Sequence, residues 1–144
     1  MSGRFAIDRR VTLYAMGGLL AAVGLFGLMA ARSLGFAEAH GVEVVDVSAD
    51  YMWGRQLAFN PLGALCVVGV GLATLAVAAT RLRWLAVGTA AAALGLALVT
   101  TLQLGRDDQI LGSRAGNVVL LTAVAVALLV MALTPSGAVA DPPE

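Results

Sequence analysis

Hydrophobic residues are gathered into four long runs along the chain, and the polar residues lie between them. The runs cover residues 11–31, 61–80, 85–104 and 118–134. The first three are long enough for a helix to cross a hydrocarbon core about 30 Å thick, and the fourth is at the lower limit of that length. No Asp, Glu, Lys, Arg or His lies inside any run. This pattern predicts an all-α integral membrane protein, a bundle of four transmembrane helices.

Residues that cap or stop helices stand at the ends of the runs. Asn60 is a good N-cap for the second helix, and Pro61 suits the first helical position, where a backbone N–H would have no partner in the helix. Gly105 is expected to end the third helix, and Asn117 to introduce the fourth. The single membrane domain expected here covers residues 1–144, with outer loops at 32–60 and 105–117.

The composition argues against a water-soluble fold and against a nucleic-acid partner. Hydrophobic residues make up 60% of the chain and charged residues 12%, whereas soluble domains have about 25% charged residues. The formal net charge is zero, so the chain has no overall electrostatic attraction for nucleic acid. The single cysteine, Cys66, excludes an intrachain disulfide and the redox chemistry of a cysteine pair. We expect the lipid bilayer as a partner and no cofactor.

The arginines indicate the orientation in the membrane. Those around one set of span ends are Arg4, Arg9, Arg10, Arg81 and Arg83. Because short segments rich in Arg stay in the cytoplasm, we predict that both termini are cytoplasmic. Tyr14 and Trp84 then lie at the inner interface, the depth that amphipathic rings prefer. The use of Arg without Lys, together with abundant Ala, Val, Leu and Gly, is typical of a GC-rich bacterium, so the expected location is a bacterial inner membrane.

Small residues recur at four- and three-residue steps within the spans. They are Gly17, Ala21 and Gly24 in the first span, Gly69 and Ala73 in the second, and Gly88, Ala92 and Gly95 in the third. Such stripes let helices in lipid approach closely enough for van der Waals contact. We expect them to pack the helices of one chain together, and the alternative is that one stripe docks another subunit.

The first outer loop differs from the rest of the chain in its acidic and β-branched residues. Its weak candidate metal ligands are Glu38, His40, Glu43 and Asp46. Imidazole suits transition metals and carboxylates suit harder ions, but no second His and no Cys joins the cluster. A solvated acidic loop without a metal is therefore the expectation.

The same loop also contains candidate partner-binding residues. Residues 42–47 favour an extended strand because they are rich in Val, and no second strand of similar quality is evident. Such a strand would rest on the bundle or pair with an edge of a partner protein. Residues 51–59 are expected to lie in the outer headgroup region. The partner-binding candidates are Val42, Val44, Val45, Val47 and Trp53.

The sequence thus favours a non-catalytic accessory or scaffold subunit of a membrane complex. Its partners would be other membrane subunits or further copies of itself. One alternative is a small homo-oligomeric pore or transporter, holin-like, with Thr100, Thr101 and Thr122 lining water. Another is a membrane enzyme acting on a lipid or quinone through His40 and the loop carboxylates.

Overall fold

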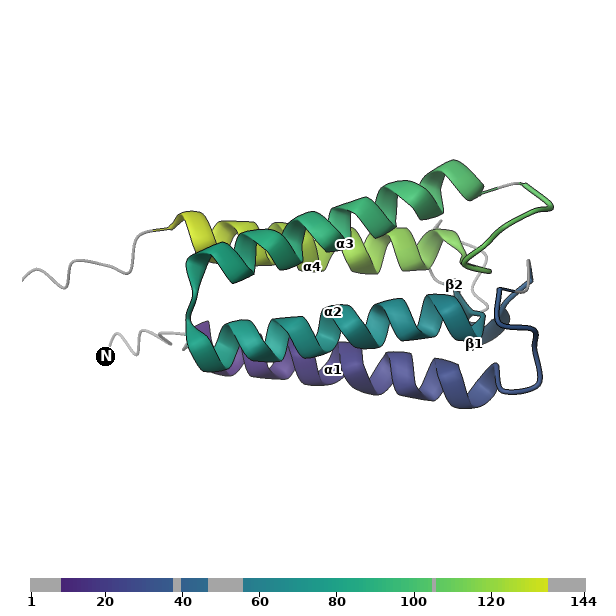
Figure 1. Cartoon of the computed structure of the whole chain (residues 1–144), viewed down its shortest axis with the longest axis horizontal. Helices are drawn as coiled ribbons and strands as arrows, with labels where there is room; N and C mark the ends of the chain where they lie inside the picture. Colours follow the sequence, from purple (N-terminus) through teal and green to yellow (C-terminus); the bar gives the residue numbers. More distant parts are fainter. Residues whose placement is uncertain (1–8, 38–39, 47–55, 105, 135–144) are drawn as a thin grey trace, which may run out of the picture.

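Four long helices form the body of the protein (Figure 1), seen in a computed structural model that describes residues 9–37, 40–46, 56–104 and 106–134. The helices are α1 (Arg9–Ala30), α2 (Pro61–Thr80), α3 (Arg83–Gln103) and α4 (Ala115–Leu133). Each is long and apolar enough to cross a membrane. The predicted four-helix membrane architecture is confirmed, and such helices place the protein in contact with the lipid bilayer.

The helices form two antiparallel hairpins that lie side by side. α1 packs along α2, α3 packs along α4, and α2 contacts α3 between the hairpins. Arg9, the α2–α3 turn and Thr134 lie at one end of the bundle, called here the terminal end. The described residues of 31–60 and 104–114 lie at the opposite end, called here the loop end. The two ends carry different chemistry.

The first hairpin is held by backbone-to-backbone approach of α1 and α2. A Cβ atom at Gly71 would lie 2.5 Å from the backbone nitrogen of Ala21, and one at Gly17 would lie 2.9 Å from the backbone nitrogen of Leu75. A Cβ at Gly24 would meet Val68 at 2.7 Å. Only glycine fits such contacts, which supply the dispersion energy that holds helices together in lipid.

The second hairpin uses alanine in place of glycine. The buried face of α3 consists of Ala86, Thr89, Ala90, Ala93, Ala97 and Thr100. On α4 the buried residues include Leu121, Val124 and Leu128, which join the alanines of α3 in one hydrophobic core with α2. Large side chains of α4 thus fill the space that the small side chains of α3 leave.

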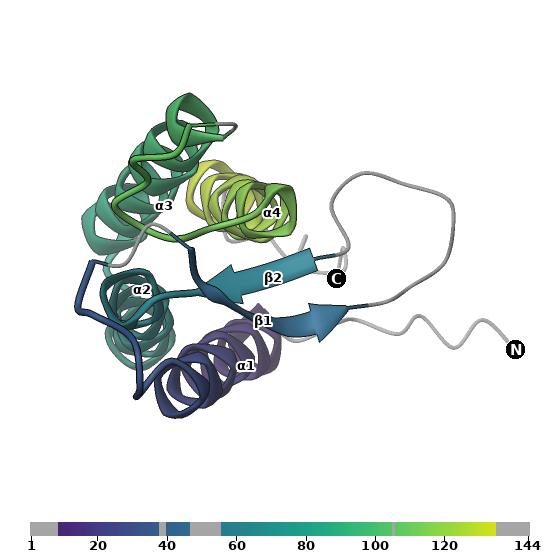
Figure 2. The ribbon, with the colours of Figure 1, turned by 90° about the vertical axis from the view of Figure 1, so that its right-hand side faces the viewer.

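A two-stranded antiparallel sheet covers the loop end (Figure 2). Strand β1 (Val42–Asp46) pairs with β2 (Gln56–Phe59), with a bulge between Glu43 and Val45. The first strand follows the prediction, whereas β2 was missed. Residues 56–59 do not lie as a surface segment among headgroups, because Phe59 is fully buried and its ring lies against Gly27 of α1.

The helix ends agree in part with the predicted boundaries. Asn60 caps α2, with Pro61 at its first position, as predicted. α3 ends at Gln103, and Gly105 lies outside the described residues. α4 begins at Ala115, earlier than expected, so that Asn117 belongs to its first turn.

Candidate functional site

The side chain of Asn117 joins the second helical hairpin to the sheet. Its Nδ2 donates to the carbonyl of Ala58 at 3.0 Å, and its Oδ1 accepts from the N–H of Ala58 at 3.2 Å. The same Oδ1 accepts from the N–H of Arg114 at 3.0 Å, at the N-terminus of α4. Asn117 is only 2% exposed. Its amide therefore bonds β2 as a neighbouring strand would and caps its own helix as well.

Asn60 makes the corresponding connection from the first hairpin to the second. Its Oδ1 accepts from the N–H of Gly63 at 2.7 Å, which caps α2. Its Nδ2 donates to the carbonyl of Ile110, in the loop before α4, at 2.6 Å. Asn60 is fully buried. Two capping asparagines thus bond across the hairpins at the loop end, so that part of this end serves to hold the structure together.

His40 lies beside a small cavity at the surface of the loop end. This cavity has a volume of about 180 Å³. It is lined by His40 and Gly41, which precede β1, and by residues of the α3–α4 loop that include Arg106, Asp107 and Ser113. Among the described residues no three His, Cys, Asp or Glu side chains gather as metal ligands would. Of the weak metal candidates, Glu38 lies outside the described residues, and the side chains of Glu43 and Asp46 are not among those described.

The partner-binding candidates of the first loop have different positions. Val42 pairs with Phe59 and Val45 with Leu57, so this part of β1 uses one of its edges inside the chain. Val44 lies at the bulge. Val47 and Trp53 lie outside the described residues. The Ala58 segment of β2 is already bonded by Asn117, and a partner strand would have to displace that side chain there.

The small-residue stripes separate into two groups. Gly17 and Gly24 face α2 inside the first hairpin, and Ala21 meets Gly71 there. By contrast, a Cβ at Gly69, Gly88 or Gly95 would meet no atom within 4 Å. Ala92 is exposed as well, whereas Ala73 is half-buried. The expectation of packing within the chain therefore does not hold for Gly88, Ala92 and Gly95, because α3 turns its alanine face to α4, and it does not hold for Gly69 of α2 either.

A larger cavity opens at the terminal end. It has a volume of about 550 Å³, and residues near the ends of all four helices line it. Its apolar wall includes Leu13 of α1, Val77 of α2, Ala86 of α3, and Leu128 and Met131 of α4. The sequence did not predict this cavity, because the segments that form it, within residues 9–13, 77–86 and 128–134, are distant from one another in the sequence.

Four arginines line the same cavity, namely Arg9, Arg10, Arg81 and Arg83. Arg9 donates to the carbonyl of Thr134 at 3.3 Å, which connects the start of α1 to the end of α4. The guanidinium of Arg10 lies over the ring of Tyr14, 5.6 Å from its centre. Arg81 is in the left-handed region, with φ 57°, and ends α2. The Arg-Leu-Arg turn is evident in the sequence, but from the sequence alone it indicates only the orientation in the membrane and not a cavity.

Most threonines in the spans are satisfied within their own helices. The hydroxyls of Thr74, Thr89 and Thr101 donate to carbonyls one turn earlier at 2.8 Å. The Oγ1 of Thr100 is buried and is the one buried side-chain oxygen or nitrogen without a partner among the described residues.

Comparison of the chain with protein-family models, with curated proteins and with solved structures gave no match.

Proposed function

We propose that the protein is a non-catalytic accessory subunit of a larger membrane complex. One observation carries this proposal, namely the outward small-residue face of α3 that Gly88, Ala92 and Gly95 form. All three are exposed, and a Cβ at either glycine would meet no other atom of the chain within 4 Å. We call these three residues the α3 outer face.

The contact between α1 and α2 supports the interpretation of this face. Gly17 and Gly71 let two helices of the chain approach until a Cβ has no room. The α3 outer face has small residues at the same four- and three-residue steps as Gly17, Ala21 and Gly24 of α1. No helix of the described chain covers it. Lipid tails gain no special contact from a small-residue face, whereas a helix can approach its backbone closely. A transmembrane helix of another subunit is therefore the occupant that fits this face.

The alternative functions receive less support from the described side chains. A pore lined by Thr100, Thr101 and Thr122 needs these hydroxyls on one surface that faces water. Thr100 is buried, Thr101 is exposed with its hydroxyl bonded to its own helix, and Thr122 is half-buried. A lipid- or quinone-directed enzyme would rely on His40, which shares a small cavity with Ser113, but the hydroxyl of Ser113 donates to the carbonyl of Leu111.

The proposed setting is a bacterial inner membrane with both termini in the cytoplasm. Support comes from the four arginines at the terminal end, since arginines in short segments favour the cytoplasmic side. Labelling single cysteines at Ser33 and at Thr134 in a Cys66→Ala background, in intact cells, tests this orientation. We expect an impermeant reagent to reach position 33 and not position 134.

Substitution on the α3 outer face tests the subunit role. The double variant Gly88→Leu/Gly95→Leu places two large side chains on this face, and Gly18→Leu is the matched control because Gly18 is exposed and equally open. After gentle purification from the native membrane, we expect a stoichiometric partner with the wild type and Gly18→Leu, and its loss from the double variant. An unchanged partner in the double variant, or a wild-type chain that purifies alone or only with itself, would contradict the proposal.

A further inference from the structure

The cavity at the terminal end combines a basic rim with an apolar interior. Arg9, Arg10, Arg81 and Arg83 supply four positive charges, and the remaining lining is mainly aliphatic. A volume of about 550 Å³ falls within the range of roughly 300 to 1,000 Å³ typical of small-molecule sites. A ligand that matches both parts has an anionic head and an apolar tail.

The described charges at this end are of one sign. Among described acidic residues, Asp107 and Asp108 lie in the α3–α4 loop, and Glu43 and Asp46 belong to β1, all at the loop end. Asp8 and the C-terminal acids Asp141 and Glu144 lie outside the described residues. The positive potential of the four arginines is therefore not offset by a described carboxylate at the cavity.

The backbone at the turn adds to this preference for an anion. Leu82 precedes α3 as its N-cap and provides no side-chain hydrogen bond, so the first N–H groups of α3 lack the cap that Asn60 provides for α2. The first of these groups belongs to Arg83, which lines the cavity together with Arg81. Helix N-termini favour anions, and arginine pairs with phosphate through two parallel hydrogen bonds.

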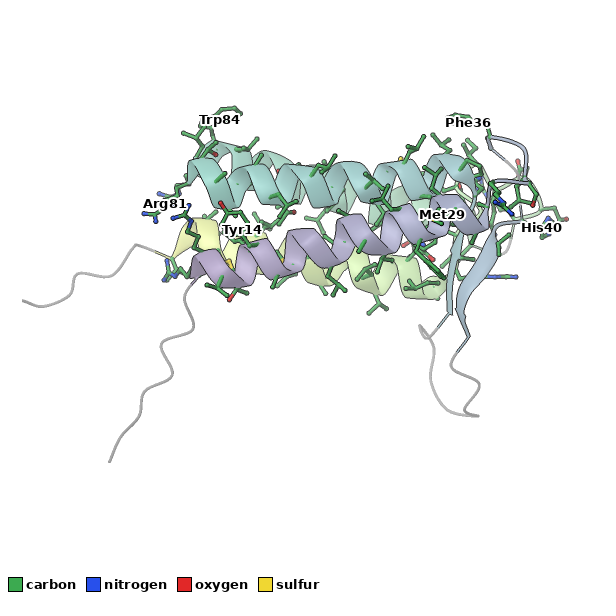
Figure 3. All side chains as sticks on the ribbon, turned by 90° about the horizontal axis from the view of Figure 1, so that it is seen from below. Tyr14, Met29, Phe36, His40, Arg81 and Trp84 are labelled. Atoms are coloured by element: carbon green, nitrogen blue, oxygen red, sulfur yellow. The ribbon has the colours of Figure 1, made fainter. Side chains whose placement is uncertain are left out.

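The cavity also lies at the depth of lipid headgroups. Figure 3 shows Arg81, Tyr14 and Trp84 at the same end of the bundle, opposite Met29 and His40. Trp84 is 69% exposed, as expected of an aromatic residue at a membrane interface. Arg83 begins a helix of 21 residues, a length of about 30 Å that matches the hydrocarbon core.

We propose that this cavity binds one anionic phospholipid from the leaflet at the terminal end. The phosphate contacts Arg81, Arg83 and the start of α3, and an acyl chain enters between the helix ends beside Leu128 and Met131. A basic pocket between transmembrane helices is a recognised form of lipid-headgroup site. Free phosphate has the same anionic group but no apolar tail. A change in the apolar wall should therefore weaken binding of the lipid and leave binding of phosphate unchanged.

Native mass spectrometry of the full chain released from detergent micelles tests the proposal. The probes are phosphatidylglycerol, phosphatidylcholine and inorganic phosphate. We expect a one-to-one complex with phosphatidylglycerol, retained about tenfold or more better than phosphatidylcholine. Equal retention of the two lipids, or displacement of phosphatidylglycerol by inorganic phosphate at a similar concentration, would overturn the proposal.

Two double variants of equal charge change locate the site. Arg81→Gln/Arg83→Gln removes two arginines of the cavity, and Arg32→Gln/Arg106→Gln removes two exposed arginines at the loop end. We expect the first to weaken binding of phosphatidylglycerol by about tenfold or more, and the second to leave it within about twofold of wild type. Equal losses in both would show a general effect of charge and would contradict the assigned cavity.

A third variant examines the apolar wall. Ala132→Phe places a ring in the cavity from the last turn of α4, a different element from the one that carries Arg81 and Arg83. With all arginines present, we expect it to reduce binding of phosphatidylglycerol strongly, and far-ultraviolet circular dichroism confirms that the helices persist. Unchanged lipid binding in this variant would mean that no acyl chain occupies the cavity, and the lipid proposal would fail.

Discussion

The amide of Asn117 bonds both backbone groups of Ala58, although 59 positions separate the two residues in the sequence. Ala58 is fully buried, so the side chain of Asn117 provides hydrogen bonds to backbone groups that water does not reach. This contact joins the second helical hairpin to the sheet that connects α1 and α2 in the first hairpin. It explains how a strand of four residues stays in place at the end of a membrane bundle.

Replacing Asn117 should therefore be costly. Asn117→Leu leaves the two polar groups of Ala58 and the N–H of Arg114 without these bonds, and we expect a loss of about 3 kcal/mol in the free energy of unfolding. Thr101→Ala is the control, because its hydroxyl bonds only to its own helix. Equilibrium unfolding in mixed micelles measures both variants. A loss for Asn117→Leu no larger than that of the control would show that the contact does not stabilise the protein.

The two roles of Asn60 can be separated by a pair of variants. Asn60→Ser keeps an oxygen that caps α2 but cannot reach Ile110, whereas Asn60→Ala removes both bonds. Loss of the cap alone costs about 1 kcal/mol, so we expect Asn60→Ala to unfold more easily than Asn60→Ser, and both more easily than wild type. The same unfolding measurement applies. Equal stability of wild type and Asn60→Ser would mean that the bond to Ile110 contributes nothing.

Glycine-to-alanine changes should have opposite effects at two positions of the first hairpin. At Gly71 the new Cβ would lie 2.5 Å from the backbone of Ala21, so α1 and α2 must move apart, at a cost of about 1 to 3 kcal/mol. At Gly18 the Cβ meets nothing within 4 Å, and alanine is the better helix former by up to about 1 kcal/mol. Thermal unfolding compares the two variants. A tolerated Gly71→Ala would contradict the close helix approach described here.

Substitution of Arg81 tests whether an arginine at this position stabilises the fold. Its φ of 57° is costly for a residue with a side chain, and glycine is usual at this position after a helix. We expect Arg81→Gly to raise stability by about 1 kcal/mol, while weakening binding of phosphatidylglycerol. A destabilised Arg81→Gly would mean that the arginine side chain itself holds the turn together, and the trade-off between stability and binding would be wrong.

The sequence predicted those parts of the fold that depend on short-range chemistry. The four spans follow from the length of each apolar run, and the start of α2 follows from Asn60 and Pro61. The strand β2 was missed because Gln56–Phe59 is short and its stability comes from β1, Gly27 and Asn117, all distant in the sequence. The helix-packing stripes were visible, but a repeat of glycine does not reveal which face turns inward on α3.

The candidate sites were harder to predict for the same reason. His40 and the acidic residues of the first outer loop stand out in the sequence because they are rare in this chain. The arginines that line the cavity at the terminal end indicate, from the sequence, only the orientation in the membrane. The existence of this cavity depends on how the ends of four helices are placed around it, and no single segment carries that information.

Crosslinking in the native membrane tests the accessory role most directly. A photoreactive amino acid is placed at Ala92 on the α3 outer face and, as a control, at Ala22, which is exposed on α1. We predict that position 92 forms a discrete adduct with one other membrane protein and that position 22 does not. If position 92 yields only lipid adducts or dimers of this chain, the protein is not an accessory subunit docked through α3.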